Sequence, residues 1–187
     1  MPLQTVTYEQ TLEPTAATSA LKKATAAAIA FGIFGIIGIT FSPINNTSLL
    51  SFIFYEILVL NTFFSVKTFS RIIPSFLSQN IIDCALVIFY GILATQFENQ
   101  KNFVIASTAY FCITTIKYSI LIKDIPKYKS ILKRKIFVNV LGVVMFAVSL
   151  QIIYMGYETA AALFYTIAFA LANIYLLAVK PLYVLPR

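Results

Sequence analysis

The sequence predicts an all-α membrane protein in which six transmembrane helices form three antiparallel hairpins. Hydrophobic residues make up 59% of the 187 positions and charged residues only 11%, whereas a soluble domain carries about 25% charged residues. The apolar residues fall into six runs, each close to the about 20 residues that a helix needs to cross a membrane. Strands of a membrane barrel alternate polar and apolar residues over about ten positions, and these runs do not alternate.

Short connections rich in turn residues separate the runs. The first connection, at 42–46, reads Ser-Pro-Ile-Asn-Asn, the connection at 97–102 reads Phe-Glu-Asn-Gln-Lys-Asn, and Gly156 precedes the turn between the last two runs. Links this short make consecutive helices antiparallel neighbours. The predicted spans cover residues 24–41, 48–66, 76–95, 103–122, 136–155 and 159–179. Together they form one transmembrane domain over residues 24–179.

Basic residues mark one side of this domain. They precede the first span and follow the second, fourth and sixth, and the opposite side carries only Lys101. The basic residues are Lys22, Lys23, Lys67, Arg71, Lys123, Lys127, Lys129, Lys133, Arg134, Lys135, Lys180 and Arg187. Because cytoplasmic loops carry the excess of Lys and Arg, both termini are expected in the cytoplasm. Residues 1–23 and 180–187 are then cytoplasmic tails, and residues 123–135 form a basic cytoplasmic loop.

The composition argues against several kinds of cofactor, metal and catalytic site. The chain has no His and no Trp, and haem or zinc sites built on imidazole nitrogens need His. Cys84 and Cys112 each lie inside an apolar run and are expected to be small packing residues. No Gly-rich phosphate loop and no Ser beside a recognisable base occurs. We therefore expect no enzymatic activity, no cofactor and no metal.

Three ionisable side chains fall within the predicted spans, where charges are costly and usually face protein or water. Glu56 lies near the middle of the second span, with no basic residue at its own depth, so a functional carboxyl is favoured there. Asp83 and Lys117 lie in the inner halves of neighbouring spans, within about 5 Å of the same depth. An ion pair between them is therefore expected.

Other polar residues share helix faces with these three. Asn80, Asp83 and Tyr90 are spaced i, i+3, i+10, and Thr114 lies one turn from Lys117. The candidate solute or ion pathway comprises Glu56, Asn80, Asp83, Tyr90, Thr114, Lys117, Asn139 and Asn173. The alternative is that these groups only hold helices together, since interhelical hydrogen bonds in bilayers contribute about 0.6 kcal/mol on average.

A stripe of small residues follows the first span. Thr25, Ala28, Gly32 and Gly35 are spaced i, i+3, i+7, i+10, which lets another backbone approach closely. That backbone belongs either to another helix of this chain or to a partner membrane subunit.

The segment 123–135 carries an amphipathic pattern, with Ile125, Tyr128 and Leu132 at i, i+3, i+7. Such a segment can lie on the anionic inner leaflet as a helix. The candidate lipid-binding residues are Lys127, Lys129, Lys133, Arg134 and Lys135. The alternatives are that these cations only set the orientation of the protein, or that they bind a protein partner.

A motif of a basic residue, Pro, any residue and an aromatic residue recurs after each inner helix end. Its prolines are Pro74, Pro126 and Pro181, which are 52 and then 55 residues apart. Triplication of a two-helix unit would explain the motif. Ordinary helix exits would explain it as well, and an inverted repeat of three helices fits the same helix count.

The pathway residues favour a small transporter or channel for a small solute or ion. The alternative is a non-catalytic accessory or assembly subunit of a larger membrane complex, for which short loops and small-residue faces are also suitable. An enzyme acting on lipid ranks last, because Glu56 and Asp83 differ in depth by about 6 Å. Nucleic acid is not an expected partner, because the net charge of +7 is spread beside a membrane.

Overall fold

The computed structural model describes residues 14–72, 77–179 and 182–183 as a bundle of six α-helices. The helices are α1 (Pro14–Phe41), α2 (Asn46–Phe69), α3 (Leu77–Ala94), α4 (Gln100–Asp124), α5 (Lys129–Tyr154) and α6 (Glu158–Ile174). A 3-10 turn, Pro126–Tyr128, precedes α5, and a π-helical turn, Tyr175–Val179, extends α6. The prediction of an all-helical fold with six helices is confirmed.

Five of the described helical segments are long and apolar enough to cross a membrane. They correspond to α1, α2, α4, α5 and α6 with its π-helical extension. The remaining segment, Gln79–Ala94 of α3, is apolar but shorter. The chain is thus a polytopic helical membrane protein. Five of the six predicted spans meet the length for crossing within the described residues, and the remaining one, 76–95, begins outside them.

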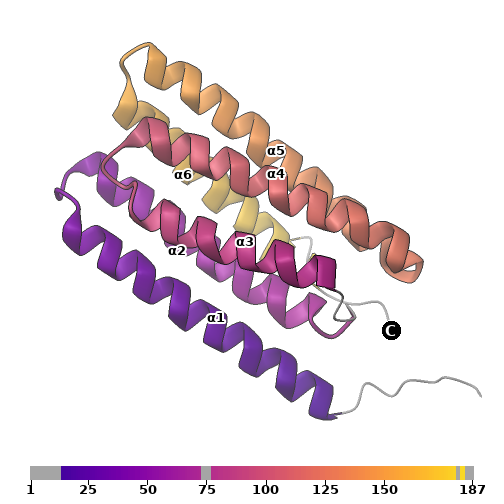
Figure 1. Cartoon of the computed structure of the whole chain (residues 1–187). Coiled ribbons are helices and arrows are strands. Elements are labelled where there is room, and N and C mark those ends of the chain that lie inside the picture. Colours follow the sequence, from indigo (N-terminus) through magenta and orange to yellow (C-terminus); the bar gives the residue numbers. More distant parts are fainter. Residues whose placement is uncertain (1–13, 73–76, 180–181, 184–187) are drawn as a thin grey trace, which may run out of the picture.

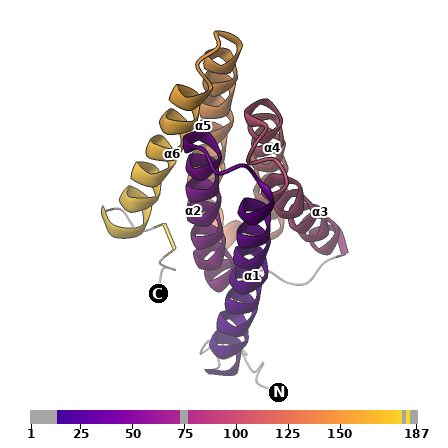
Figure 2. The ribbon, with the colours of Figure 1, turned by 90° about the vertical axis from the view of Figure 1, so that its left-hand side faces the viewer.

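The helices pack in a ring in the order α1, α2, α6, α5, α4, α3, and α3 returns to α1. Contacts between α2 and α4 cross the middle of this ring. All six helices run roughly along one direction, and Figure 2 shows the α5 and α6 pair on one side of α2 and the α3 and α4 pair on the other. One end of the bundle holds the ends of α2 and α4 and the start of α5, with Lys67, Lys123 and Lys129. We call it the basic end, and the opposite end the far end.

The ring order does not follow a threefold repeat of hairpins. In such a repeat, α3 would lie relative to α1 as α5 lies relative to α3. Instead α1 packs directly on α3, whereas α4 lies between α3 and α5. The arrangement of the described helices therefore does not favour triplication of a two-helix unit. Of the three motif prolines only Pro126 is described, because Pro74 and Pro181 lie outside the described residues.

Local signals in the sequence form the turns at the far end. The Asn45 side chain caps α2 by accepting hydrogen bonds from the backbone N–H groups of Thr47 and Ser48, and Asn99 caps α4 in the same way through Asn102. Such caps satisfy N–H groups that have no partner within the helix. Gly156 adopts a φ of +86° between α5 and α6, a conformation that favours glycine.

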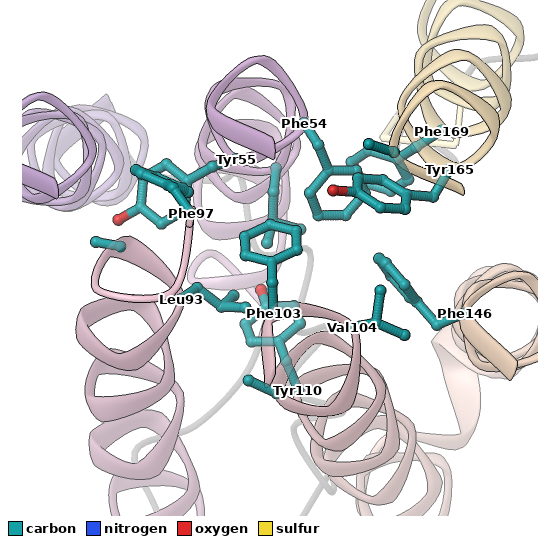
Figure 3. Packing of buried hydrophobic residues seen from close by; sticks show 14 of the residues in the cluster. Phe54, Tyr55, Leu93, Phe97, Phe103, Val104, Tyr110, Phe146, Tyr165 and Phe169 are labelled. Carbon is teal, nitrogen blue, oxygen red and sulfur yellow. The ribbon is translucent and has the colours of Figure 1, made fainter. Parts of the chain in front are cut away.

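Aromatic side chains fill the far half of the bundle (Figure 3). The Phe54 ring lies 5.3 Å from the ring of Phe146, 5.4 Å from that of Tyr165 and 5.9 Å from that of Phe103, measured between centroids. All four side chains are fully buried. Because they come from α2, α4, α5 and α6, they join four helices in one packed layer, which we call the aromatic seal.

A buried polar network lies beside this seal and leaves none of its groups unpaired. The Gln100 amide donates to Ser51 Oγ at 2.7 Å, and Tyr165 donates to the Gln100 amide oxygen at 2.8 Å. A third bond of 2.6 Å joins the Ser51 and Tyr165 hydroxyls. Satisfied groups of this kind stabilise helix contacts without requiring water.

The small-residue stripe on α1 packs within the chain. A Cβ atom at Gly35 would lie 2.7 Å from the Tyr55 ring and would also contact the Glu56 carboxylate, and Gly32 faces the same carboxylate. Gly35 therefore contacts α2 of the same chain. Thr25, at the other end of the stripe, is exposed, and Ala28 is half-buried.

The basic segment differs from the prediction of a loop or surface helix over 123–135. α4 continues to Asp124, and α5 already begins at Lys129. Ile131 and Leu132 are buried in a cluster that includes Phe69 and Leu121. The apolar side chains of this segment pack onto the bundle, so much of the expected loop becomes the first turns of α5.

Candidate functional site

A cavity of about 340 Å³ lies between α1, α2, α3 and α4 and the first turns of α5. Its walls carry many hydroxyl, amide and charged groups, although the helices around it are apolar. On α3 the lining extends from Gln79, near the basic end, to Tyr90, a distance of about 16 Å along the helix. We call this cavity the polar chamber.

Three hydroxyl groups and a stacked ring close the inner end of the polar chamber. Tyr90 donates to the Leu58 carbonyl at 3.1 Å and is hydrogen bonded to Thr62. The Tyr110 hydroxyl lies 3.4 Å from the hydroxyls of both Thr62 and Tyr90. The Phe31 ring stacks on Tyr90 with centroids 3.9 Å apart. None of the four aromatic-seal side chains lines the chamber, so this floor separates the chamber from the seal within the described residues.

An ion pair lies in the chamber wall. Lys117 of α4 donates to the Asp83 carboxylate of α3, as the depth of the two residues led us to expect. The Asp83 side chain is 53% exposed and the Lys117 side chain 15% exposed. Both residues line the chamber, so a solute entering from the basic end would meet this pair.

Lys135 is the most deeply buried charged group of the chamber, with an exposed fraction of only 5%. Its ammonium group donates to Asn61 Oδ1 at 2.9 Å and to the Tyr183 hydroxyl at 2.8 Å. It also lies 5.2 Å from the centre of the Tyr183 ring and 6.0 Å from that of Tyr118. Amide and phenol oxygens and two aromatic faces thus hold the cation in place.

An amide chain extends from Lys135 toward α6. Tyr183 donates to Asn61 Oδ1 at 2.9 Å, and the Asn61 amide nitrogen donates to Asn173 Oδ1. The Asn173 amide nitrogen then donates to the Phe169 carbonyl at 2.8 Å. Asn173 therefore supports Asn61 from behind and does not line the chamber.

Two buried amides of the chamber wall carry atoms that have no hydrogen-bond partner within the described residues. The nitrogen of Asn139 is unpartnered, as are both the nitrogen and the oxygen of Gln79. The exposed fractions of these residues are 3% and 2%. A buried polar group without a partner costs about 1–3 kcal/mol, so water or a solute in the chamber would stabilise both.

The structure brings six of the eight predicted pathway residues to the chamber wall. They are Asn80, Asp83, Tyr90, Thr114, Lys117 and Asn139. Asn173 lies behind the wall, and Glu56 lies between α1 and α2, where it faces Gly32 and Gly35.

Helix geometry explains the position of Glu56. Asn61 follows it by five residues, and about 100° per residue turns the two side chains about 140° apart around α2. Asn61 faces the chamber, so Glu56 points to a different seam. Its Oε1 atom is buried there without a hydrogen-bond partner in the described part of the chain.

Sequence reasoning left several polar residues out of the pathway, among them Asn61, Ser65, Gln79 and Lys135. Asn61 and Ser65 are spaced i, i+4 within the second apolar run, a signal that was present and could have been used. We had assigned Lys135 to the loop and to lipid binding. That assignment is wrong for its location, because the helix turns Lys135 into the bundle interior.

The other predicted lipid-binding residues lie at the surface of the basic end. Lys127, Lys129 and Lys133 are exposed, and Arg134 is half-buried. Lys133 and Arg134 border a second hollow, of about 740 Å³, between α5 and α6. Its other lining side chains are almost all apolar. No three His, Cys, Asp or Glu side chains of the described ranges come together as a metal site.

No family model, curated protein or solved structure matches this chain.

Proposed function

We propose that the protein is a membrane transporter for a small polar solute, which binds in the polar chamber. The chamber itself carries the proposal: a cavity of about 340 Å³ within an apolar bundle, lined by an ion pair, a buried lysine and unpartnered amides. Polar and ionisable groups at membrane depth are costly and mark solute or ion pathways. Purely structural contacts would be expected to satisfy Gln79 and Asn139 as well.

The asymmetry of the bundle favours a carrier over a channel. The chamber ends at Tyr90, and the aromatic seal with its satisfied polar network closes the far half. A channel needs a continuous path, whereas a carrier opens to one side at a time. With the basic end in the cytoplasm, as the positive-inside rule predicts, this conformation is a carrier open to the inside.

Exposed lysines at the basic end are positioned to contact membrane lipids. Exposed Lys127, Lys129 and Lys133 lie where the basic end would meet the membrane surface. Lys side chains near an anionic leaflet contribute about 1 kcal/mol each to binding. We therefore assign these three residues, and not Lys135, to contact with anionic lipid headgroups.

An accessory subunit is the second candidate. Asp83 with Lys117, and Asn61 with Asn173, are directly paired across helices, which also suits a protein that only packs against partners. The two candidates differ in whether water enters the chamber and whether the far half ever opens.

Accessibility of cysteines tests the proposal. Cys84 and Cys112, which are free and exposed, are replaced by Ser, and single cysteines are placed at Thr114 in the chamber or at Phe103 in the aromatic seal. In proteoliposomes, a membrane-impermeant thiol reagent should modify Cys at position 114 from the basic side and leave position 103 unmodified from that side. A carrier also exposes position 103 to the far side in its second conformation. Protection of position 114 from both sides would contradict the transport proposal and favour the accessory subunit.

A further inference from the structure

We infer that the polar chamber is an anion site, which binds the carboxylate or phosphate group of a small solute through Lys135 and Asn139. The inference depends on the proposed role of the chamber in solute binding, and it names the class of solute.

The charges that line the chamber are unbalanced. Lys23, Lys117 and Lys135 face a single carboxylate, that of Asp83. Asp83 is already paired with Lys117. Within the described residues no carboxylate lies at salt-bridge distance from Lys135. A buried charge without a counter-charge is costly in a medium of low dielectric constant, and a bound anion would supply the counter-charge.

Unused hydrogen-bond donors converge on the same wall. The Lys135 ammonium has three hydrogens, and it donates two, to Asn61 and Tyr183. Asn139 lies one turn further along α5, on the same helix face, and its amide nitrogen has no acceptor in the described part of the structure. An oxyanion accepts hydrogen bonds from both kinds of donor.

The site is preorganised for this role. Asn61, Tyr183 and the aromatic rings hold the Lys135 ammonium in one position, so little side-chain freedom remains to be lost on binding. A metal cation would instead need several oxygen ligands, and the single chamber carboxylate is already occupied by Lys117. The volume of about 340 Å³ lies at the lower end of ligand cavities, which indicates a small anion.

Charge selectivity at one cysteine tests the inference even before the natural solute is identified. The probes are two methanethiosulfonate reagents, one carrying sulfonate and the other trimethylammonium, applied to the full chain with a single Cys at position 114. A control chain carries its single Cys at position 40, where Thr40 is exposed near the far end. We expect the anionic reagent to react at position 114 about tenfold faster, relative to the cationic one, than at position 40.

Lys135→Met should remove this preference, and Lys129→Met, which changes an exposed cation on the same helix, should retain it. If Lys135→Met does not fold, the inference is tested instead by whether added solutes protect position 114 from modification, in the parent chain and in Asn139→Leu. Sodium phosphate or sodium succinate should slow modification of position 114 in the parent chain, whereas glucose and choline chloride should not. Protection by phosphate indicates a phosphate site, and protection by succinate indicates a carboxylate site. In Asn139→Leu the protection should be weaker.

The outcomes separate the inference from the proposed function. If position 114 reacts equally with both reagents, or faster with the cationic one, the anion site is wrong while a water-filled chamber remains. If only glucose or choline protects position 114, the anion site is likewise wrong. If position 114 does not react at all, the solute chamber itself is refuted.

Discussion

Two ionisable side chains inside the bundle have opposite surroundings. Lys135 is surrounded by oxygen atoms and aromatic faces that suit a cation, whereas the buried Oε1 atom of Glu56 has no hydrogen-bond partner within the described residues. The first environment is built by α2, α5 and the residues after α6, and the second by the close approach of α1 to α2. Of these two side chains, Lys135 lines the polar chamber and Glu56 does not.

Asn61 should be the residue on which the Lys135 environment depends most. Asn61→Leu removes the acceptor for both Lys135 and Tyr183 and leaves Asn173 Oδ1 without its donor. Unpaired buried groups of this kind cost about 1–3 kcal/mol, so the unfolding temperature in detergent should fall. Asn102→Leu is the matched control, because Asn102 is exposed and its hydrogen bonds within the described residues, to Asn99 and Gln96, are local. Equal unfolding temperatures for the two variants would contradict this account.

At the scale of elements, the contact between α1 and α2 depends on the absence of a side chain at Gly35. Gly35→Ala would place a methyl group 2.7 Å from the Tyr55 ring and against the Glu56 carboxylate. Overpacking of this kind costs about 1–3 kcal/mol. In contrast, a Cβ atom at Gly91 of α3 has open space within 4 Å.

The pair Gly35→Ala and Gly91→Ala gives a prediction with its control. Gly35→Ala should lower the unfolding temperature in detergent, because the added methyl group pushes α1 away from α2. Gly91→Ala should leave it unchanged or raise it, since alanine is favoured over glycine in a helix by up to about 1 kcal/mol. A loss of stability of the same size in both variants would show that the close approach at Gly35 does not stabilise the hairpin.

The existence of the helices was predictable from the sequence, whereas contacts between residues far apart in the chain mostly were not. Apolar runs and turn residues predict that six helices exist and where the turns at the far end lie, because these signals are local. They do not predict that α1 begins at Pro14 and α5 at Lys129, because both starts lie outside the apolar runs. The burial of Lys135 depends on Asn61, which is 74 positions away in the sequence, so the local pattern assigned it to a loop. In contrast, the pair Asp83 and Lys117 was predictable because antiparallel neighbours place equal depths together.

On the scale of the whole molecule, the bundle has one half closed by aromatic packing and one half hollowed by polar groups. The boundary between them is the floor at Tyr90, where the Phe31 ring stacks on the side that faces α1. A carrier of this construction must part the far ends of its helices to release solute there. The far ends of α2 and α6 are joined by a bond of 3.2 Å between the Thr47 and Thr159 hydroxyls.

A disulfide at this position should therefore hold the protein in the conformation described here. In a chain with Cys84 and Cys112 replaced by Ser, we expect cysteines at positions 47 and 159 to form a disulfide, because the hydroxyl oxygens of Thr47 and Thr159 lie 3.2 Å apart and sulfur atoms would take their places. Oxidation should stop flux of whichever anion protects the chamber, and reduction should restore the flux. The single variant Thr47→Cys controls for oxidation elsewhere and should transport equally well under both conditions. Flux that persists after complete cross-linking would mean that α2 and α6 do not separate at the far end, and the solute would then have to leave between other helices.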